Sequence, residues 1–152
     1  DALPILRFRY ADGARDAEAL LAHPETGQLV IVTKDASGSQ AYALDPPPSP
    51  TATITLRAPT PVAVAGLIPL VTGGDVRPDG GAIALRTYVG VWLYTVAPGE
   101  SLQSALGRQP CPLPTPSEKQ GESVSFLATG AGYVTLSEGA SAQLMRVACA
   151  PR

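Results

Sequence analysis

Hydrophobic and polar positions repeat one pattern three times along this chain. The copies are residues 16–34, 72–88 and 120–138. Each copy holds an acidic residue, a short apolar run, a turn that contains glycine, and a β-type run that ends in polar residues. The acidic residues of successive copies are 57 and 47 residues apart. Repeats of about 40 to 50 residues built from short strands are typical of propeller blades, so we predict an all-β fold, a partial β-propeller of about three four-stranded antiparallel blades.

The first unit, residues 16–57, shows how the pattern predicts strands. Residues 28–33 (QLVIVT) are apolar on both faces, as in a strand that neighbouring sheets cover on both sides. Residues 17–22 and 40–44 flank this run across turns that contain glycine, and residues 52–57 are expected to be the fourth strand.

The second unit, residues 67–114, contains the one predicted helix. Strands are expected at residues 82–88 and 91–96. Residues 98–107 (PGESLQSALG) place apolar residues at helical spacing and end at glycine, which predicts a short surface helix. The proline-rich residues 109–114 suit an edge strand, because proline cannot donate a hydrogen bond to a strand ladder.

Both ends of the chain are predicted to leave a blade incomplete. The third unit, residues 120–149, has three strands at most, so its fourth strand must come from elsewhere. Residues 1–10 end in ILRFRY, which alternates apolar with polar residues, and we interpret this run as the outer strand of a preceding blade. Residues 1–152 then form a single partial propeller domain. Its expected partner is the remainder of the propeller, as a missing segment or a second chain.

Composition and charge narrow the class of protein. The chain has 152 residues, 45% hydrophobic content and a formal net charge of -2, which is enough for one domain with a core. Its 15 glycines and 16 prolines favour many tight turns. With only two lysines there is no basic stripe, so nucleic acid is not an expected partner. No apolar run is long enough to predict a membrane span, and the start at Asp1 without a signal peptide suggests cleavage or truncation.

The two cysteines, Cys111 and Cys149, lack CxxC spacing and a nearby histidine, which argues against a metal or redox site. A disulfide is the favoured expectation, and two buried free thiols are the alternative. A disulfide would imply an oxidising compartment.

Three motifs carry a resemblance to known proteins. They are RDAEALLAHPETGQLVIVTK, VTGGDVRPDGGAIALRTY and QGESVSFLATGAGYVTLSEG. Through them residues 10–148 resemble the C-terminal half of secreted bacterial β-propellers. That largely uncharacterised group is loosely akin to the esterase-like-phytase, calcium-dependent phytase and WD40-like propellers. The resemblance implies a propeller fold and a secreted or periplasmic location, and it implies no activity because the group has no agreed one.

The acids of the repeats are the candidate metal ligands. The first strand of a blade lines the central channel, so Glu18, Asp75 and Glu122 are expected to approach one axis. Their repulsion could be relieved by Ca²⁺, which binds carboxylate, carbonyl and water oxygens. Hydrogen bonds to backbone amides of adjoining blades are an alternative. So is a counter-charge from a basic residue, for which the candidates are Lys34, Arg77 and Arg86.

Other polar residues fit binding better than catalysis. The single histidine, His23, precedes a turn proline, which favours a solvent-facing loop imidazole over a catalytic base. Phytase-type propellers need a lysine density that this chain lacks. Trp92 and Tyr94 lie on one predicted strand and are expected to pack between blades. The predicted channel-lining or ligand-binding residues are Asp16, Glu18, Lys34, Asp75, Arg86, Glu122 and Glu138.

The sequence therefore predicts an extracytoplasmic propeller module that acts as a binding or structural scaffold for a protein or small-molecule ligand. The alternative is a calcium-dependent hydrolase of the phytase or lactonase type, with its site at the propeller channel.

Overall fold

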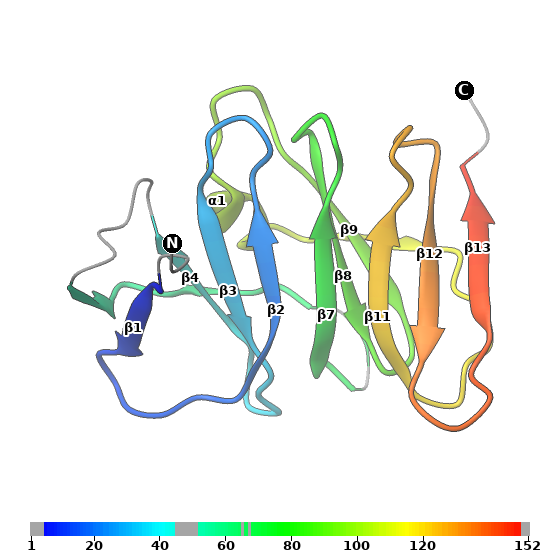
Figure 1. Cartoon of the computed structure of the whole chain (residues 1–152), viewed down its shortest axis with the longest axis horizontal. Helices are drawn as coiled ribbons and strands as arrows, with labels where there is room; N and C mark the ends of the chain where they lie inside the picture. Colours follow the sequence, from blue (N-terminus) through cyan, green and yellow to red (C-terminus); the bar gives the residue numbers. More distant parts are fainter. Residues whose placement is uncertain (1–4, 45–51, 65, 67, 150–152) are drawn as a thin grey trace.

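Three antiparallel sheets stand side by side in a row, with one short helix and a two-stranded pair beside them (Figure 1). This computed structural model describes residues 5–44, 52–64, 66 and 68–149. The predicted all-β class is confirmed, because every described element except one five-residue helix is a strand.

The first sheet has the strand order β2-β3-β4-β6. Its bounds are β2 (Ala17–Ala22), β3 (Leu29–Thr33), β4 (Gln40–Leu44) and β6 (Thr60–Pro61). A strand is present within residues 52–57 as expected, but it is not the fourth strand of this sheet. That segment forms β5 (Thr53–Leu56), which pairs in parallel with β1 (Arg7–Tyr10) outside the sheet. The short β6 is instead the fourth strand of the sheet. It lies at the sheet edge, where proline is tolerated because fewer backbone N–H groups donate to a neighbouring strand.

The second sheet has the order β10-β9-β8-β7. Its bounds are β7 (Val71–Val76), β8 (Ala82–Thr87), β9 (Val91–Thr95) and β10 (Cys111–Leu113). The predicted helix is present as α1 (Leu102–Leu106), which begins where the Ser101 side chain caps the backbone N–H of Ser104. Its apolar residues Leu102, Ala105 and Leu106 are buried.

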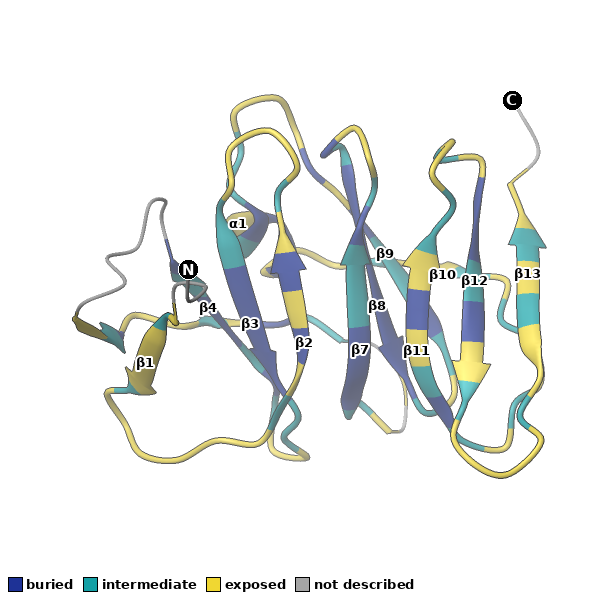
Figure 2. Ribbon diagram, in the orientation of Figure 1, coloured by how far each residue is buried: buried dark blue, intermediate teal, exposed yellow. Residues whose placement is uncertain are grey.

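The third sheet contains three strands in the described residues, as predicted. They are β11 (Gly121–Phe126), β12 (Gly132–Ser137) and β13 (Leu144–Ala148). The middle strand β12 of this sheet is the most buried, whereas β13 alternates between exposed and intermediate residues (Figure 2). The strand β13 is therefore the least buried strand of the third sheet.

The same β-bulge occurs near the start of each sheet. The register shifts between Ala17 and Ala19 in β2, between Val71 and Gly73 in β7, and between Gly121 and Ser123 in β11. A β-bulge inserts one residue and re-aims its side chain. The three inserted residues are Glu18, Thr72 and Glu122.

The first strands β2, β7 and β11 lie side by side along the row (Figure 1). Glycines allow this close approach: a Cβ added at Gly73 would lie 2.7 Å from the carbonyl oxygen of Glu122, and one at Gly74 would lie 3.0 Å from Leu21. The backbones of adjacent sheets therefore meet most closely along their first strands.

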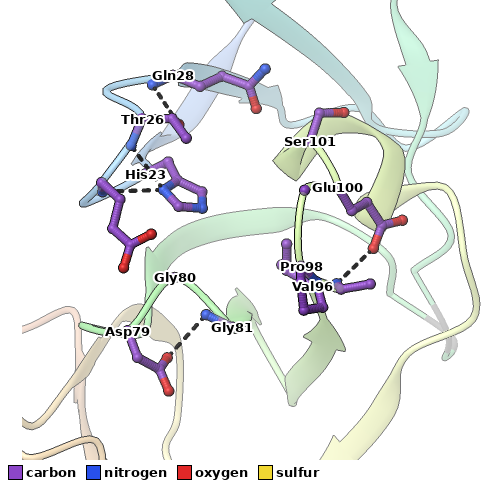
Figure 3. Close-up of a pocket in the computed structure, with 13 residues that line it drawn as sticks. His23, Thr26, Gln28, Asp79, Gly80, Gly81, Val96, Pro98, Glu100 and Ser101 are labelled. Atoms are coloured by element: carbon purple, nitrogen blue, oxygen red, sulfur yellow. Dashed lines mark hydrogen bonds between the residues drawn. The ribbon is translucent and has the colours of Figure 1, made fainter.

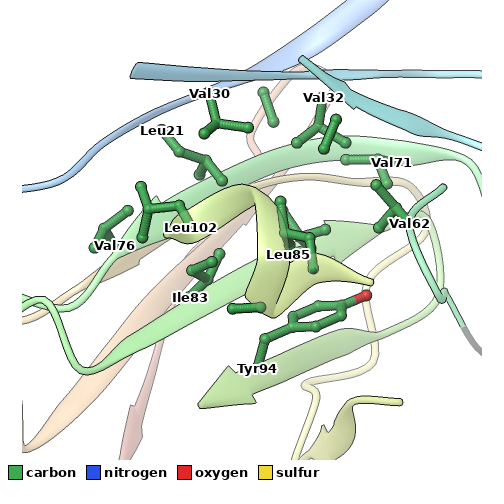
Figure 4. Close-up of a cluster of buried hydrophobic side chains, with 14 of the residues drawn as sticks. Leu21, Val30, Val32, Val62, Val71, Val76, Ile83, Leu85, Tyr94 and Leu102 are labelled. Carbon is green, nitrogen blue, oxygen red and sulfur yellow. The ribbon is translucent and has the colours of Figure 1, made fainter. Parts of the chain in front are cut away.

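The main core lies between the first two sheets and is capped by α1 (Figure 4). Leu21 and Val30 meet Ile83 and Leu85 across the sheet boundary. All six residues of β8 are buried, as expected for a strand covered on both faces. The members of this central core are Ala19, Leu21, Val30, Val32, Ala41, Val62, Val71, Val76, Ile83, Leu85, Tyr94, Val96, Leu102, Ala105 and Leu106.

The expected packing role of the two aromatic residues in β9 agrees with the structure. Tyr94 belongs to the central core, and its hydroxyl donates a hydrogen bond to the Ala63 carbonyl at 3.1 Å. Burial raises the Tyr94 pKa. Trp92 packs against the same core, and its Nε1 is buried without a hydrogen-bond partner in the described residues.

Candidate functional site

The bulges place polar side chains at one end of the sheets, which we call the bulge end. Glu18 accepts a hydrogen bond from Lys34 Nζ at 2.8 Å, and the same ammonium lies 4.9 Å from the ring centre of Tyr88. The hydrogen bond from Lys34 to Glu18 and the interaction with Tyr88 raise the lysine pKa. Asp16 joins this end through its carbonyl oxygen, which accepts from the Lys34 amide.

A second polar group lies at the bulge end of the third sheet. The side-chain amide of Gln120 donates to Glu122 and to Glu138, both at 2.8 Å. The Gln120 carbonyl also accepts from the Glu138 amide. Two predicted site residues, Glu122 and Glu138, are therefore held together by one neutral side chain that sequence reasoning did not select.

Hydrogen bonds connect the second sheet to the third at this end. The Gly121 amide donates to the Tyr88 carbonyl at 3.2 Å. The hydroxyl of the bulge residue Thr72 donates to the Gly121 carbonyl at 2.8 Å. Polar groups from all three sheets therefore share the bulge end.

Asp75 does not share the position of Glu18 and Glu122. The bulge aligns Thr72 with those two residues, so Asp75 lies three residues further along its strand. Its carboxylate accepts from the Ser125 hydroxyl at 2.9 Å and the Phe126 amide at 2.7 Å. Asp75 therefore ties β7 to β11, which is the backbone-amide alternative considered for the repeat acids.

The expected meeting of the three acids around one metal ion is not found in the described residues. Glu18 pairs with Lys34, Asp75 bonds to β11, and Glu122 shares Gln120. Within the described ranges, no three His, Cys, Asp or Glu side chains are placed to hold a metal ion. The reason is the register of β7, which sets Asp75 apart from the other two acids.

Arg86 forms a buried ion pair between the second and third sheets. Its Nη2 lies 2.7 Å from Glu118, and the two side chains are 1% and 4% exposed. Glu118 also accepts from the Thr135 hydroxyl at 2.5 Å. Burial lowers the Arg86 pKa, and the charge of Glu118 opposes that effect. Arg86 Nε and Nη1 have no hydrogen-bond partner in the described residues.

The sequence predicted Arg86 as a channel-lining residue or as a counter-charge for the repeat acids, but it is buried and pairs with Glu118, which was not predicted. A usable signal exists, because Arg86 lies in a run that is otherwise apolar on both faces. A charge in such a strand needs a buried partner. The other proposed counter-charge, Arg77, lies at the opposite end of β7 and pairs with Asp79 at 2.7 Å.

A cavity of about 510 Å³ opens at the end opposite the bulges (Figure 3). The turn after β2, the turn after β7 and the loop before α1 form its walls. His23 is half-buried there, and its Nδ1 accepts hydrogen bonds from the amides of Glu25 and Thr26 at 3.2 and 3.3 Å. The imidazole also lies against Gly80, where an added Cβ would be 2.7 Å away. His23 therefore holds two turns in place.

Two acids of this cavity, Asp79 and Glu100, are engaged in local contacts. Asp79 accepts from Arg77 and from the Gly81 amide, and both interactions lower its pKa. Glu100 accepts from the Ala97 amide at 2.9 Å and from Arg108 at 2.7 Å. The contacts of Glu100 hold the loop before α1 in place.

The predicted disulfide is absent from the structure. Cys111 and Cys149 are both unpaired and exposed, so the alternative of two buried thiols is also wrong. Cys111 lies in β10, the outermost strand of the second sheet, and Cys149 follows β13 at the outer edge of the third. No covalent bond ties these two outer edges together.

The chain matches no model of a known protein family and no curated protein sequence. No helix in the described ranges is both long enough and apolar enough to cross a membrane.

Proposed function

We propose that the chain supplies consecutive blades of a β-propeller and acts as an extracytoplasmic binding module, with its ligand at the bulge end. The observation that carries the proposal is the bulge repeated at one position of three sheets. Bulges are specific features that re-aim side chains near sites, and blades arranged around an axis would bring their first strands together. The side-by-side packing of β2, β7 and β11 supports this arrangement.

The chemistry of the bulge end favours a ligand with N–H or O–H donors. Glu122 and Glu138 are joined through the neutral Gln120 amide, and neither forms a salt bridge in the described residues. An ionised carboxylate accepts hydrogen bonds and cannot donate one. Glu18, in contrast, is already paired with Lys34.

Binding is favoured over calcium-dependent hydrolysis because, among the described residues, no three His, Cys, Asp or Glu side chains are placed to hold a metal ion. His23 uses Nδ1 to hold a turn, and it lies at the other end of the sheets from Glu122. The runner-up remains a calcium-dependent hydrolase of the phytase or lactonase type, which would require carboxylates gathered around the ion.

The test screens the purified chain against arrays of glycans and of lysine-containing peptides. We expect a bound probe whose binding falls at least tenfold in Glu138→Gln and is unchanged in Glu25→Gln, a matched change in the opposite cavity. Release of p-nitrophenol from p-nitrophenyl phosphate, or lactone opening, that requires added calcium would instead support the hydrolase. A probe that responds only to Glu25→Gln would contradict the bulge end as the site.

A further inference from the structure

The described strands divide unevenly among the repeats. The first and second sheets each have four strands, whereas the third has three and β13 has no outer neighbour. The strand β1 lies outside all three sheets, paired only with β5. Among the described strands, the third sheet is therefore one strand short of the other two, while β1 and β5 form a separate pair.

The position of β1 in the chain matches that of a fourth strand. β6 is followed by the first strand β7, and β10 is followed by the first strand β11. In the same way β1 is followed by the first strand β2. Together, β1, β11, β12 and β13 have the strand content of one complete sheet.

These strands cannot combine within one row, because they lie at its opposite ends (Figure 1). Both ends of the row contain exposed residues (Figure 2), and some of these residues are large and apolar. On the first sheet, Leu20 is 64% exposed beside Phe8, which is 43% exposed, and both line a groove of about 410 Å³. On the third sheet, the paired residues Leu136 and Leu144 are 38% and 66% exposed.

The geometry points to a second copy of this chain as the partner. We propose that β1 of each copy adds to the outer edge of β13 in the other, so that the third sheet of one copy packs on the first sheet of its partner. This inference rests on the propeller architecture proposed above. Two copies of the three described sheets would form a ring of six, which lies within the range of about four to eight blades of known propellers. The two contacts between the copies would be identical.

The location of β1 already suits this arrangement. It lies over the outer face of the first sheet, where Tyr10 packs on Tyr42 with ring centres 4.9 Å apart. That face is where the partner's third sheet would pack. β1 could therefore join the partner while keeping its contact with Tyr42, and only its parallel pairing with β5 would have to change.

The free edge of β13 can accept a strand at a defined residue. The Cys149 amide donates to Ala131, so the alternation of an antiparallel ladder directs the amides of Val147 and Met145 toward β12. The amide of Arg146 then points away from β12. Arg146→Pro removes a donor on the outer edge and leaves the ladder with β12 intact.

Light scattering after size-exclusion chromatography tests the proposal. The wild-type chain is expected at twice the 15.6 kDa mass of one copy. Arg146→Pro should halve the mass, and Arg146→Ala, which keeps the amide, should not. Leu144→Glu, which changes an exposed side chain and should fold alone, should also give the single-copy mass because it would bury a charge between the sheets.

A monomeric wild-type chain, a dimer that persists in both Arg146→Pro and Leu144→Glu, or a larger open assembly would each overturn the second-copy inference. The binding function is measured separately by the Glu138→Gln comparison. A monomer whose probe binding still depends on Glu138 would reject the second copy and leave the proposed function standing.

Discussion

At the scale of single residues, Gly73 shows how closely two sheets approach. A Cβ there would lie 2.7 Å from a backbone oxygen, the carbonyl of Glu122. A backbone atom within a strand cannot rotate away as the end of a side chain can. The absence of a side chain is therefore a requirement for packing β7 on β11.

Gly73→Ala is expected to destabilise the fold by about 2 to 3 kcal/mol, in the range of overpacked cores. Urea denaturation followed by circular dichroism measures this change. Gly107→Ala is the control, because Gly107 has φ of -75° and its added Cβ would meet chiefly a methyl group of Thr60. Equal stability in the two variants would contradict the close approach.

The ion pair of Arg86 and Glu118 gives a second prediction at this scale. Removing one partner leaves a buried charge uncompensated, so Glu118→Gln should cost about 3 kcal/mol. Replacing both with apolar residues, as in Arg86→Met with Glu118→Leu, should recover most of that loss. Denaturant melts of the two variants are compared, and a double variant less stable than Glu118→Gln would contradict the prediction.

The sequence placed some site residues correctly and others incorrectly, and the β-bulges explain much of the difference. Glu18 and Glu122 occupy equivalent positions because each is the residue inserted by the bulge of its strand. Asp75 was grouped with them because it is acidic, but a bulge changes the register in a way that letter spacing does not show. The partner of Arg86 is 32 residues away in sequence, so only the packing of two sheets identifies Glu118.

At the scale of elements, the loop before α1 depends on one carboxylate. Glu100 accepts from the Ala97 amide, Arg108 and Ser104, and these bonds lower its pKa, the Ala97 amide most of all. A group whose pKa is lowered in the folded state stabilises that state above its ordinary pKa. The contribution disappears as pH falls through the lowered value.

Glu100→Gln should therefore lose about 1 kcal/mol of stability near pH 7 and almost none near pH 3. Thermal melts at both pH values measure the difference. Glu25→Gln, on a neighbouring turn, is the control and should behave as wild type at both. A loss of the same size at pH 3 would show that the Glu100 contacts act independently of charge.

The sequence predicted strands and helices correctly where a run was apolar on both faces or where a segment ended in a helix-terminating glycine. The apolar runs predicted β3 and β8, and the glycine-terminated segment predicted α1. The place of β5 was mispredicted, because a strand-forming sequence does not specify which edge it joins. The short β6 carries too few residues to give a pattern.

At the scale of the whole molecule, no disulfide in the described part of the chain links the three sheets, which are held against one another by noncovalent packing. Cys111 and Cys149 are exposed and unpaired. Iodoacetamide should therefore modify both thiols of the native chain without reductant, and mass spectrometry counts the adducts. The melting temperature should be the same with and without dithiothreitol. A chain that resists modification until it is reduced would contradict this prediction.

The central core gives the protein an optical property that requires no added dye. Trp92 is the chain's single tryptophan, and its ring packs against the core shared by two sheets and α1. Indole emission shifts to longer wavelength when water reaches the ring. The fluorescence of the chain's tryptophan therefore reports on the surroundings of Trp92 alone. A shift of its emission to longer wavelength would follow the loosening of the second sheet in real time.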